Sequence, residues 1–168
     1  MKKVLFLLSL TTASFVSFSQ SSGSSNPLSF SVGAEAALPV GDLGLGTSFG
    51  IGASAQIDYM VAESVAVTGN VGYINFVGKS VNGVTGSSIG IIPVLAGIKY
   101  HFNDQFYGSA QLGMSFASVN GDSQSGLTFA PGVGYKINEQ FDVMAKYTSV
   151  SLKGWTASAI GLRVAYNF

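Results

Sequence analysis

The single histidine, His101, is the first side chain of this 168-residue chain that could do acid–base chemistry. A serine hydrolase or acyltransferase needs a histidine base beside a serine nucleophile, with a third group that orients the base. His101 comes instead directly before a tight polar turn, on the charge-bearing face of an alternating run. We therefore expect a structural role for His101, no catalytic residue and no enzymatic activity.

A glycine pattern at residues 50–55 matches the Gly-x-Gly-x-x-Ala fingerprint of dinucleotide-binding loops. That fingerprint needs a helix directly after it. Here the alternation continues through Gln56, Ile57 and Asp58, which predicts a strand. The chain has no cysteine, and its histidine and acidic residues lack the spacing of metal ligands. We expect neither a cofactor nor a metal ion.

Seven charged residues inside alternating runs are the remaining candidates for chemistry. Each lies on the strand face opposite its apolar neighbours, as Arg163 does between Leu162 and Val164. Enclosed in a barrel, such charges must pair, which predicts a polar network that fills the lumen. The alternative is a narrow pore lined by the same groups. The seven are Glu35, Asp58, Lys99, Lys136, Asp142, Lys146 and Arg163.

These charges need strands to position them, and the sequence predicts eight. The last is the clearest, because every second residue back from Phe168 is apolar. Each run is long enough for the roughly 9–11 residues of a tilted membrane strand. The predicted strands are 28–38, 47–60, 64–77, 87–102, 106–118, 126–137, 141–152 and 156–168.

The connections between these strands are of two kinds. Three are tight turns with an acid, at Glu63, Asp104 and Glu139. Four are longer or richer in glycine and serine, and span residues 39–46, 78–86, 119–125 and 153–155. This alternation predicts an up-and-down antiparallel barrel, whose tight turns face the periplasm if it lies in an outer membrane.

Composition favours a membrane barrel over a soluble carrier with an apolar cavity. Charged residues make up 10% of the chain and its mean hydropathy is +0.41, whereas soluble domains carry about 25% charged residues. No charge lies on the apolar face, and the opposite face is rich in glycine and alanine. Aromatic residues gather on the apolar face near the tight turns, as in an interfacial girdle. They are Tyr59, Tyr100, Phe102, Phe106, Tyr135, Phe141, Tyr166 and Phe168.

The first residues predict export. Residues 1–19 combine Lys2 and Lys3 with an apolar run and small residues before a cleavage site at Gln20, as in a signal peptide. Residues 20–27 form a flexible lead, and residues 28–168 form the barrel. Removal of the signal leaves six basic and eight acidic residues. This balance gives no reason to expect nucleic acid as a partner.

The turn at residues 135–141, its two counterparts and the terminal residues 165–168 resemble those of small eight-stranded outer-membrane β-barrel proteins of the outer membrane protein A and X type. This resemblance covers residues 28–168. It implies an outer-membrane location, a monomer bathed in outer-membrane lipid, and a last strand read by the barrel-assembly machinery during insertion. The residues that match this signal are Leu162, Val164, Tyr166 and Phe168.

The sequence thus predicts an integral outer-membrane barrel with a structural or surface-interaction role. The main alternative is a small pore for ions or small solutes. A soluble exported lipid carrier and a lipid-modifying enzyme rank below it. No motif in the loops indicates a ligand or a surface partner.

Overall fold

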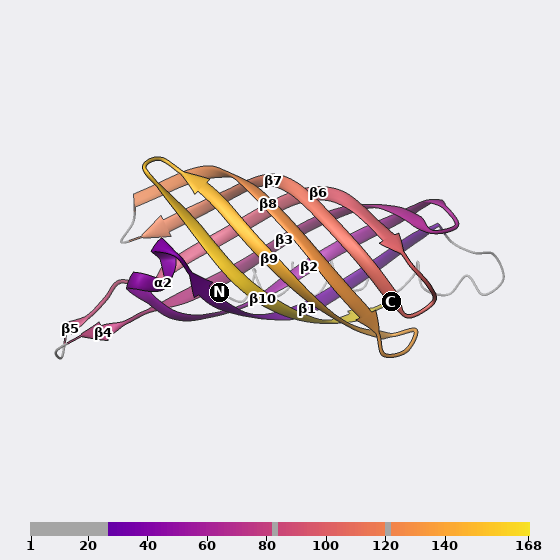
Figure 1. Cartoon of the computed structure of the whole chain (residues 1–168), viewed down its shortest axis with the longest axis horizontal. Helices are drawn as coiled ribbons and strands as arrows, with labels where there is room; N and C mark the ends of the chain where they lie inside the picture. Colours follow the sequence, from indigo (N-terminus) through magenta and orange to yellow (C-terminus); the bar gives the residue numbers. More distant parts are fainter. Residues whose placement is uncertain (1–26, 82–83, 120–121) are drawn as a thin grey trace, which may run out of the picture.

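A closed barrel of eight strands makes up the computed structural model, which describes residues 27–81, 84–119 and 122–168. Each strand pairs antiparallel with its neighbours in the chain, and the first strand pairs with the last to close the cylinder (Figure 1). The predicted fold class is therefore confirmed. The strands are β1 (Leu28–Val40), β2 (Thr47–Ala62), β3 (Val65–Gly78), β6 (Ile89–His101), β7 (Phe106–Val119), β8 (Asp122–Lys136), β9 (Phe141–Leu152) and β10 (Trp155–Asn167).

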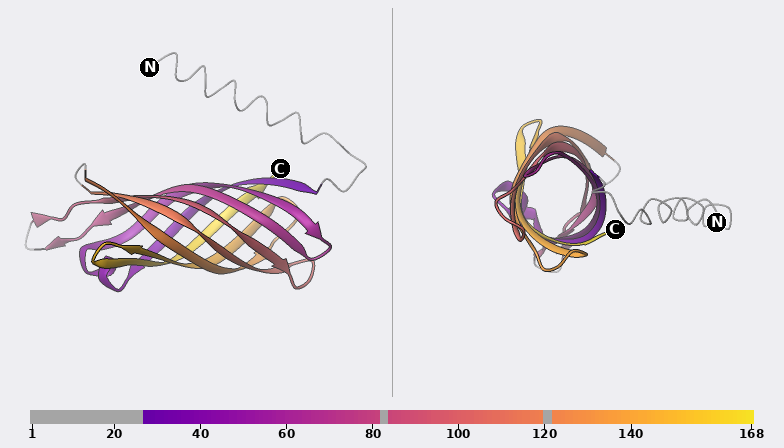
Figure 2. Two further views of the ribbon diagram at one scale, coloured as in Figure 1. Left: turned by 90° about the horizontal axis from the view of Figure 1, so that it is seen from above. Right: turned by 90° about the vertical axis from the view of Figure 1, so that its right-hand side faces the viewer.

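The two ends of the cylinder differ, although less than the sequence predicts. At the loop end, a short helix α2 (Asp42–Gly46) follows β1, and a small hairpin of β4 (Ser80–Val81) and β5 (Val84–Thr85) projects beyond the barrel (Figures 1 and 2). The other two connections at this end are also short. The connection predicted at 153–155 is as short as expected, whereas most of the loop predicted at 119–125 belongs to strands. Strand β8 already begins at Asp122, and Gly154 (φ +88°) allows a short turn between β9 and β10.

Side chains alternate between the two faces of the wall, as the sequence predicts. Val164 and Leu162 on β10 are 44% and 47% exposed, whereas Arg163 between them is 1% exposed. No helix among the described residues is long and apolar enough to cross a membrane. The signal peptide predicted for residues 1–19, and all but the last residue of the lead at 20–27, lie outside the described residues.

Two prolines interrupt the hydrogen-bonded ladder without shifting its register. Pairing between β3 and β6 passes from Val71–Val94 directly to Ile74–Ile91, which skips the pairs around Pro93. The β8–β9 ladder has a similar gap beside Pro131. Proline has no backbone N–H to donate, which explains why the ladder breaks there while the strands stay aligned.

Candidate functional site

The lumen is the candidate site, because it holds all seven charged residues that the sequence singled out. Six of them are buried, and Lys136 is half-buried. Two ion pairs form between strands that are not neighbours. Lys146 Nζ on β9 lies 2.9 Å from Glu35 Oε1 and 2.8 Å from Oε2 on β1. Lys99 on β6 pairs with Asp58 on β2.

The other three charges are arranged differently from a simple set of pairs. Within the described residues, neither Arg163 nor Lys136 forms an ion pair with a carboxylate. Arg163 instead donates from Nε to Ser54 Oγ at 2.9 Å and from Nη2 to Ser31 Oγ at 3.0 Å. Asp142 accepts hydrogen bonds from the Tyr107 hydroxyl at 2.7 Å and from Asn167 Nδ2 at 2.9 Å.

Buried amides connect these groups across the cylinder. Gln56 Nε2 on β2 donates to Asp58 Oδ1 at 2.9 Å. The Oε1 atom of Gln56 accepts from Gln111 Nε2 on β7 at 3.3 Å, and β7 lies three places from β2 around the barrel. Gln111 Nε2 also lies 3.2 Å from Thr68 Oγ1 on β3. The Gln111 side chain on β7 therefore reaches across the lumen to side chains of β2 and β3.

Lys136 lies at the turn end, at the rim of an open hollow of about 660 Å³. The acids of all three tight turns, Glu63, Asp104 and Glu139, line this hollow together with His101. His101 is thus part of the turn-end mouth, 6.0 Å from the Tyr107 ring centroid.

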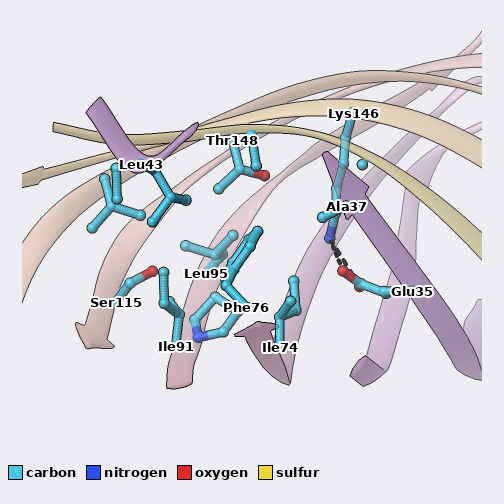
Figure 3. A pocket seen from close by; sticks show the side chains of 15 residues that line it. Glu35, Ala37, Leu43, Ile74, Phe76, Ile91, Leu95, Ser115, Lys146 and Thr148 are labelled. Carbon is cyan, nitrogen blue, oxygen red and sulfur yellow. Dashed lines mark hydrogen bonds and ion pairs between the residues drawn. The ribbon is translucent and has the colours of Figure 1, made fainter. Parts of the chain in front are cut away.

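Most buried side chains in the loop-side half of the lumen are apolar, which the sequence pattern did not predict. Ser115 and Thr128 also lie there and share a hydrogen bond of 2.7 Å. Leu43 reaches in from α2 and packs with side chains of the wall, and the small cavity beside them has a volume of about 30 Å³ (Figure 3). The Glu35–Lys146 pair borders the same cavity, so polar and apolar halves meet there. The buried apolar cluster consists of Ala37, Leu43, Ile74, Phe76, Ile91, Ala117, Val150, Leu152, Ala157 and Ala159.

A signal for this cluster is present in the sequence. In the run 89–95, apolar residues follow one another with only Gly90 and Pro93 between them, so both faces of the strand become apolar. Phe76 likewise stands on the inner face of its strand, and it is 3% exposed. Breaks in alternation near the loop end thus mark the buried apolar side chains.

The described residues provide no group of three or more His, Cys, Asp or Glu side chains that could hold a metal ion. Residues 50–55 lie inside β2, so their glycine pattern does not open a helix. Two stretches match the Gly-x-Ser-x-Gly pattern of serine hydrolases, around Ser48 and Ser88. Both serines are at the loop end, whereas His101 is at the turn end, about 43 Å along the strand direction from Ser88 at about 3.3 Å per residue. Neither serine lies within reach of His101.

Several solved outer-membrane barrels have the same architecture. Ail, the attachment invasion locus protein of Yersinia pestis, aligns with a TM-score of 0.62 and 17% identity over 84% of this chain and 97% of its own. The N-terminal barrel domain of OprF of Pseudomonas aeruginosa gives a TM-score of 0.56 and 15% identity over 83% and 97% of the two chains. Neisserial surface protein A aligns with a TM-score of 0.55 and 19% identity over 84% of this chain and 97% of its own. At these identities the likeness concerns the fold.

A comparison with curated protein sequences finds no match. The family model for the outer membrane protein beta-barrel domain matches residues 6–168, nearly the whole chain. The chain therefore belongs to the outer membrane β-barrel family, and the protein is an integral protein of the outer membrane.

Proposed function

We propose that this protein is a closed, non-conducting barrel with a structural or surface-interaction role in the outer membrane. The observation that carries the proposal is that side chains from non-neighbouring strands bind one another across the lumen. Lys146 with Glu35 and Gln111 with Gln56 are the main examples. Eight-stranded barrels are just wide enough for side chains to fill them.

The apolar half strengthens the case against a pore. Ions crossing the lumen would have to pass Leu43, Phe76 and Ile91, which offer no hydrogen bonds to replace the water of hydration. The cavity between them holds about 30 Å³, enough for roughly two water molecules. A cavity of this size is too small for a hydrated ion to pass.

Planar bilayer recording on the purified barrel tests the closed lumen. We expect no steady single-channel current from wild-type protein. Reproducible conductance steps that disappear when the protein is omitted would favour the alternative, a small pore for ions or small solutes.

The remaining parts of the proposal concern orientation and partners. The tight turns face the periplasm and the loop end faces outward, as the short-turn rule for such barrels predicts. The barrel is a monomer, does no enzymatic chemistry, and is inserted by the barrel-assembly machinery through its last strand. Residues 1–19 serve as its cleaved signal.

Contacts at the outer surface would involve α2 and the projecting hairpin. The Lys79 backbone N–H donates to Gly46 O at 2.9 Å, and Gly86 N donates to Lys79 O at 2.8 Å, so the two features are joined. The charges of the four loop segments are Asp42, Lys79, Asp122 and Lys153. Ail of Yersinia pestis was crystallised with the heparin analogue sucrose octasulfate. The balanced loop charges here give no reason to extend that ligand to this chain.

A further inference from the structure

The turn-end hollow, the open cavity of about 660 Å³ between the three tight turns, has a volume within the range of small-molecule sites. It lies at the end of the cylinder that faces the viewer in the right-hand view of Figure 2. Glu63 is in the turn between β2 and β3, Asp104 in the turn between β6 and β7, and Glu139 in the turn between β8 and β9. Acids from three separate turns therefore meet around one opening.

The basic groups of the hollow lie on the strands, below the acids of the turns. Lys136 is the last residue of β8 and His101 is the last residue of β6. Both are half-buried, whereas the three acids are exposed. Charge is therefore arranged in two layers, with the ammonium and imidazole groups inside and the carboxylates at the rim.

The side chains of these two basic residues have no partner within the part of the chain that the structure describes. Lys136 forms no ion pair, and the Nδ1 atom of His101 is buried without a hydrogen-bond partner. Asp142 is opposite Lys136 in the β8–β9 register, but it accepts hydrogen bonds from Tyr107 and Asn167 instead. A half-buried ammonium group without a partner favours binding of a carboxylate.

Two of the three turns hold their acids in fixed positions. The side-chain oxygen of Asn103 accepts hydrogen bonds from the backbone N–H groups two and three residues later, at 2.9 and 2.7 Å, and Asn138 makes the same two bonds in its own turn. Asp104 and Glu139 directly follow these asparagines. Their backbone is therefore ordered before a ligand arrives, which lowers the entropy that binding costs.

A simple ion complements only one of the two layers. A small anion would have to pass the three carboxylates at the rim, and a polyamine would meet the ammonium group of Lys136 inside, where like charges repel. No group of three His, Cys, Asp or Glu side chains suited to a metal ion occurs in residues 27–81, 84–119 and 122–168. A ligand that is negative at its inner end and positive at its outer end complements both layers.

We propose that the turn-end hollow binds a short zwitterionic peptide, with both termini unblocked. The peptide carboxylate pairs with Lys136 and His101, and its ammonium group pairs with the acids at the rim, a form of terminal-group capture. Phe102 and Ile137, which line the hollow and are 62% and 55% exposed, provide apolar contacts for small side chains between the two ends. In the orientation proposed above, such peptides enter from the periplasm.

NMR titration of the full-length folded barrel in a maltoside detergent tests the site. This detergent has no charged headgroup, and a micelle leaves both ends of the barrel open to solvent, so the result does not depend on which end faces the periplasm. The probe is tri-alanine. We expect saturable shifts of the turn-end amide signals, half-saturated at a concentration on the order of 1 mM, and no shifts at the loop end.

Two blocked forms of the probe identify the charges that the hollow binds. N-acetyl-tri-alanine lacks the ammonium group, and tri-alanine amide lacks the carboxylate. Each should bind about tenfold more weakly than tri-alanine, because one charge-assisted hydrogen bond is lost.

Variants assign each terminus to its layer. Lys136→Met should weaken tri-alanine binding about tenfold and abolish its advantage over the amide, while its advantage over the acetylated form remains. A variant with a neutral rim should show the reverse pattern. It combines Glu63→Gln, Asp104→Asn and Glu139→Gln.

Two matched variants change charges at the loop end. Lys153→Met and Asp122→Asn alter exposed residues outside the hollow, and both should bind tri-alanine as wild type does. Heat-modifiable gel mobility establishes that each variant is folded.

Three results would overturn the proposal. The first is no saturable shift up to a concentration on the order of 50 mM, or equal binding of tri-alanine and its two blocked forms. The second is tighter binding of spermidine, which would identify a cation site. The third is equal binding of inorganic phosphate, which would identify an anion site. Steady current in planar bilayers would contradict the closed lumen and not the peptide site.

Discussion

Lys146 and Glu35 meet inside the barrel across the intervening strand β10, with the ammonium nitrogen within 2.9 Å of both carboxylate oxygens. Their side chains are 5% and 2% exposed. The pair lies at the boundary between the polar turn-side half and the apolar loop-side half of the lumen (Figure 3). Both side chains are less exposed than those of the other ion pair, Lys99 and Asp58, which are 7% and 9% exposed.

Removal of one partner of this pair should be much worse than removal of both. Lys146→Met leaves a buried carboxylate unpaired, and we expect a loss of about 3–5 kcal/mol in the free energy of unfolding. Lys146→Met combined with Glu35→Leu should recover most of this loss, because no buried charge remains. Urea unfolding in phospholipid vesicles measures both. Equal losses in the single and double variants would contradict a coupled buried pair.

Two inward glycines on adjacent strands should respond in opposite ways to alanine. At Gly33 a Cβ atom would lie 2.9 Å from Arg163 Nε and 2.9 Å from the Val164 carbonyl oxygen, so Gly33→Ala must displace the guanidinium group or the backbone. We expect a loss of about 1–3 kcal/mol. At Gly161 the nearest atom would be 3.5 Å away. Gly161→Ala should stabilise the strand by about 0.5–1 kcal/mol, and the same unfolding measurement compares the two.

The barrel could be predicted from the sequence because the alternation of apolar and polar residues within each strand identifies its outer and inner face. Arg163 between Leu162 and Val164 identifies inside and outside without knowledge of any partner strand. The ion-pair partners could not be predicted in this way. Lys146 binds Glu35 because closure of the barrel brings β1 within two strands of β9, and that distance depends on the register of every intervening pair.

The apolar cluster in the loop-side half of the lumen could not be predicted from the sequence for a different reason. Apolar residues on both faces, as in 89–95, look like irregular strand ends when strands are read one at a time. Only the assembled barrel shows that Phe76, Ile91 and Val150 meet Leu43 of α2. The helix itself is five residues long, too short for a periodic pattern to reveal it.

The Phe76 side chain should stabilise the barrel without being the sole barrier to ions. Phe76→Ala removes a ring that is 3% exposed, and we expect a loss of about 3–5 kcal/mol. Planar bilayers should still show no steady current, because Lys146–Glu35 and Gln111–Gln56 continue to cross the lumen below it. Current from Phe76→Ala alone would show that the polar network does not close the lumen.

A charged side chain at mid-height on the outer face should destabilise the barrel. Leu112 on β7 is 53% exposed and pairs with Ala96 and Phe129, which are also outward. Leu112→Lys should cost about 2–4 kcal/mol in vesicles, as for a lysine at the bilayer midplane. Leu112→Val serves as the control and should change stability by less than about 1.5 kcal/mol. Equal stability of the lysine and valine variants would mean that water, and not hydrocarbon, meets this face.

The terminal residue should affect assembly in the cell more than stability of the finished barrel. The backbone N–H of Phe168 donates to Phe30 O at 2.9 Å, a bond that any residue can make. Its ring lies 5.0 Å from Tyr166 and 5.8 Å from Phe30, on the exposed face. Phe168→Ala therefore removes an exposed ring and leaves the ladder intact.

If Leu162, Val164, Tyr166 and Phe168 form the signal read by the assembly machinery, Phe168→Ala should reduce the folded protein in outer-membrane fractions several-fold. Refolding of the same variant from urea into vesicles, where no machinery is present, should proceed nearly as for wild type. The control is Phe102→Ala, which removes another exposed aromatic of the turn-end girdle but lies outside the last strand. Equal loss of both variants in cells would mean that the girdle, and not the terminal signal, limits insertion.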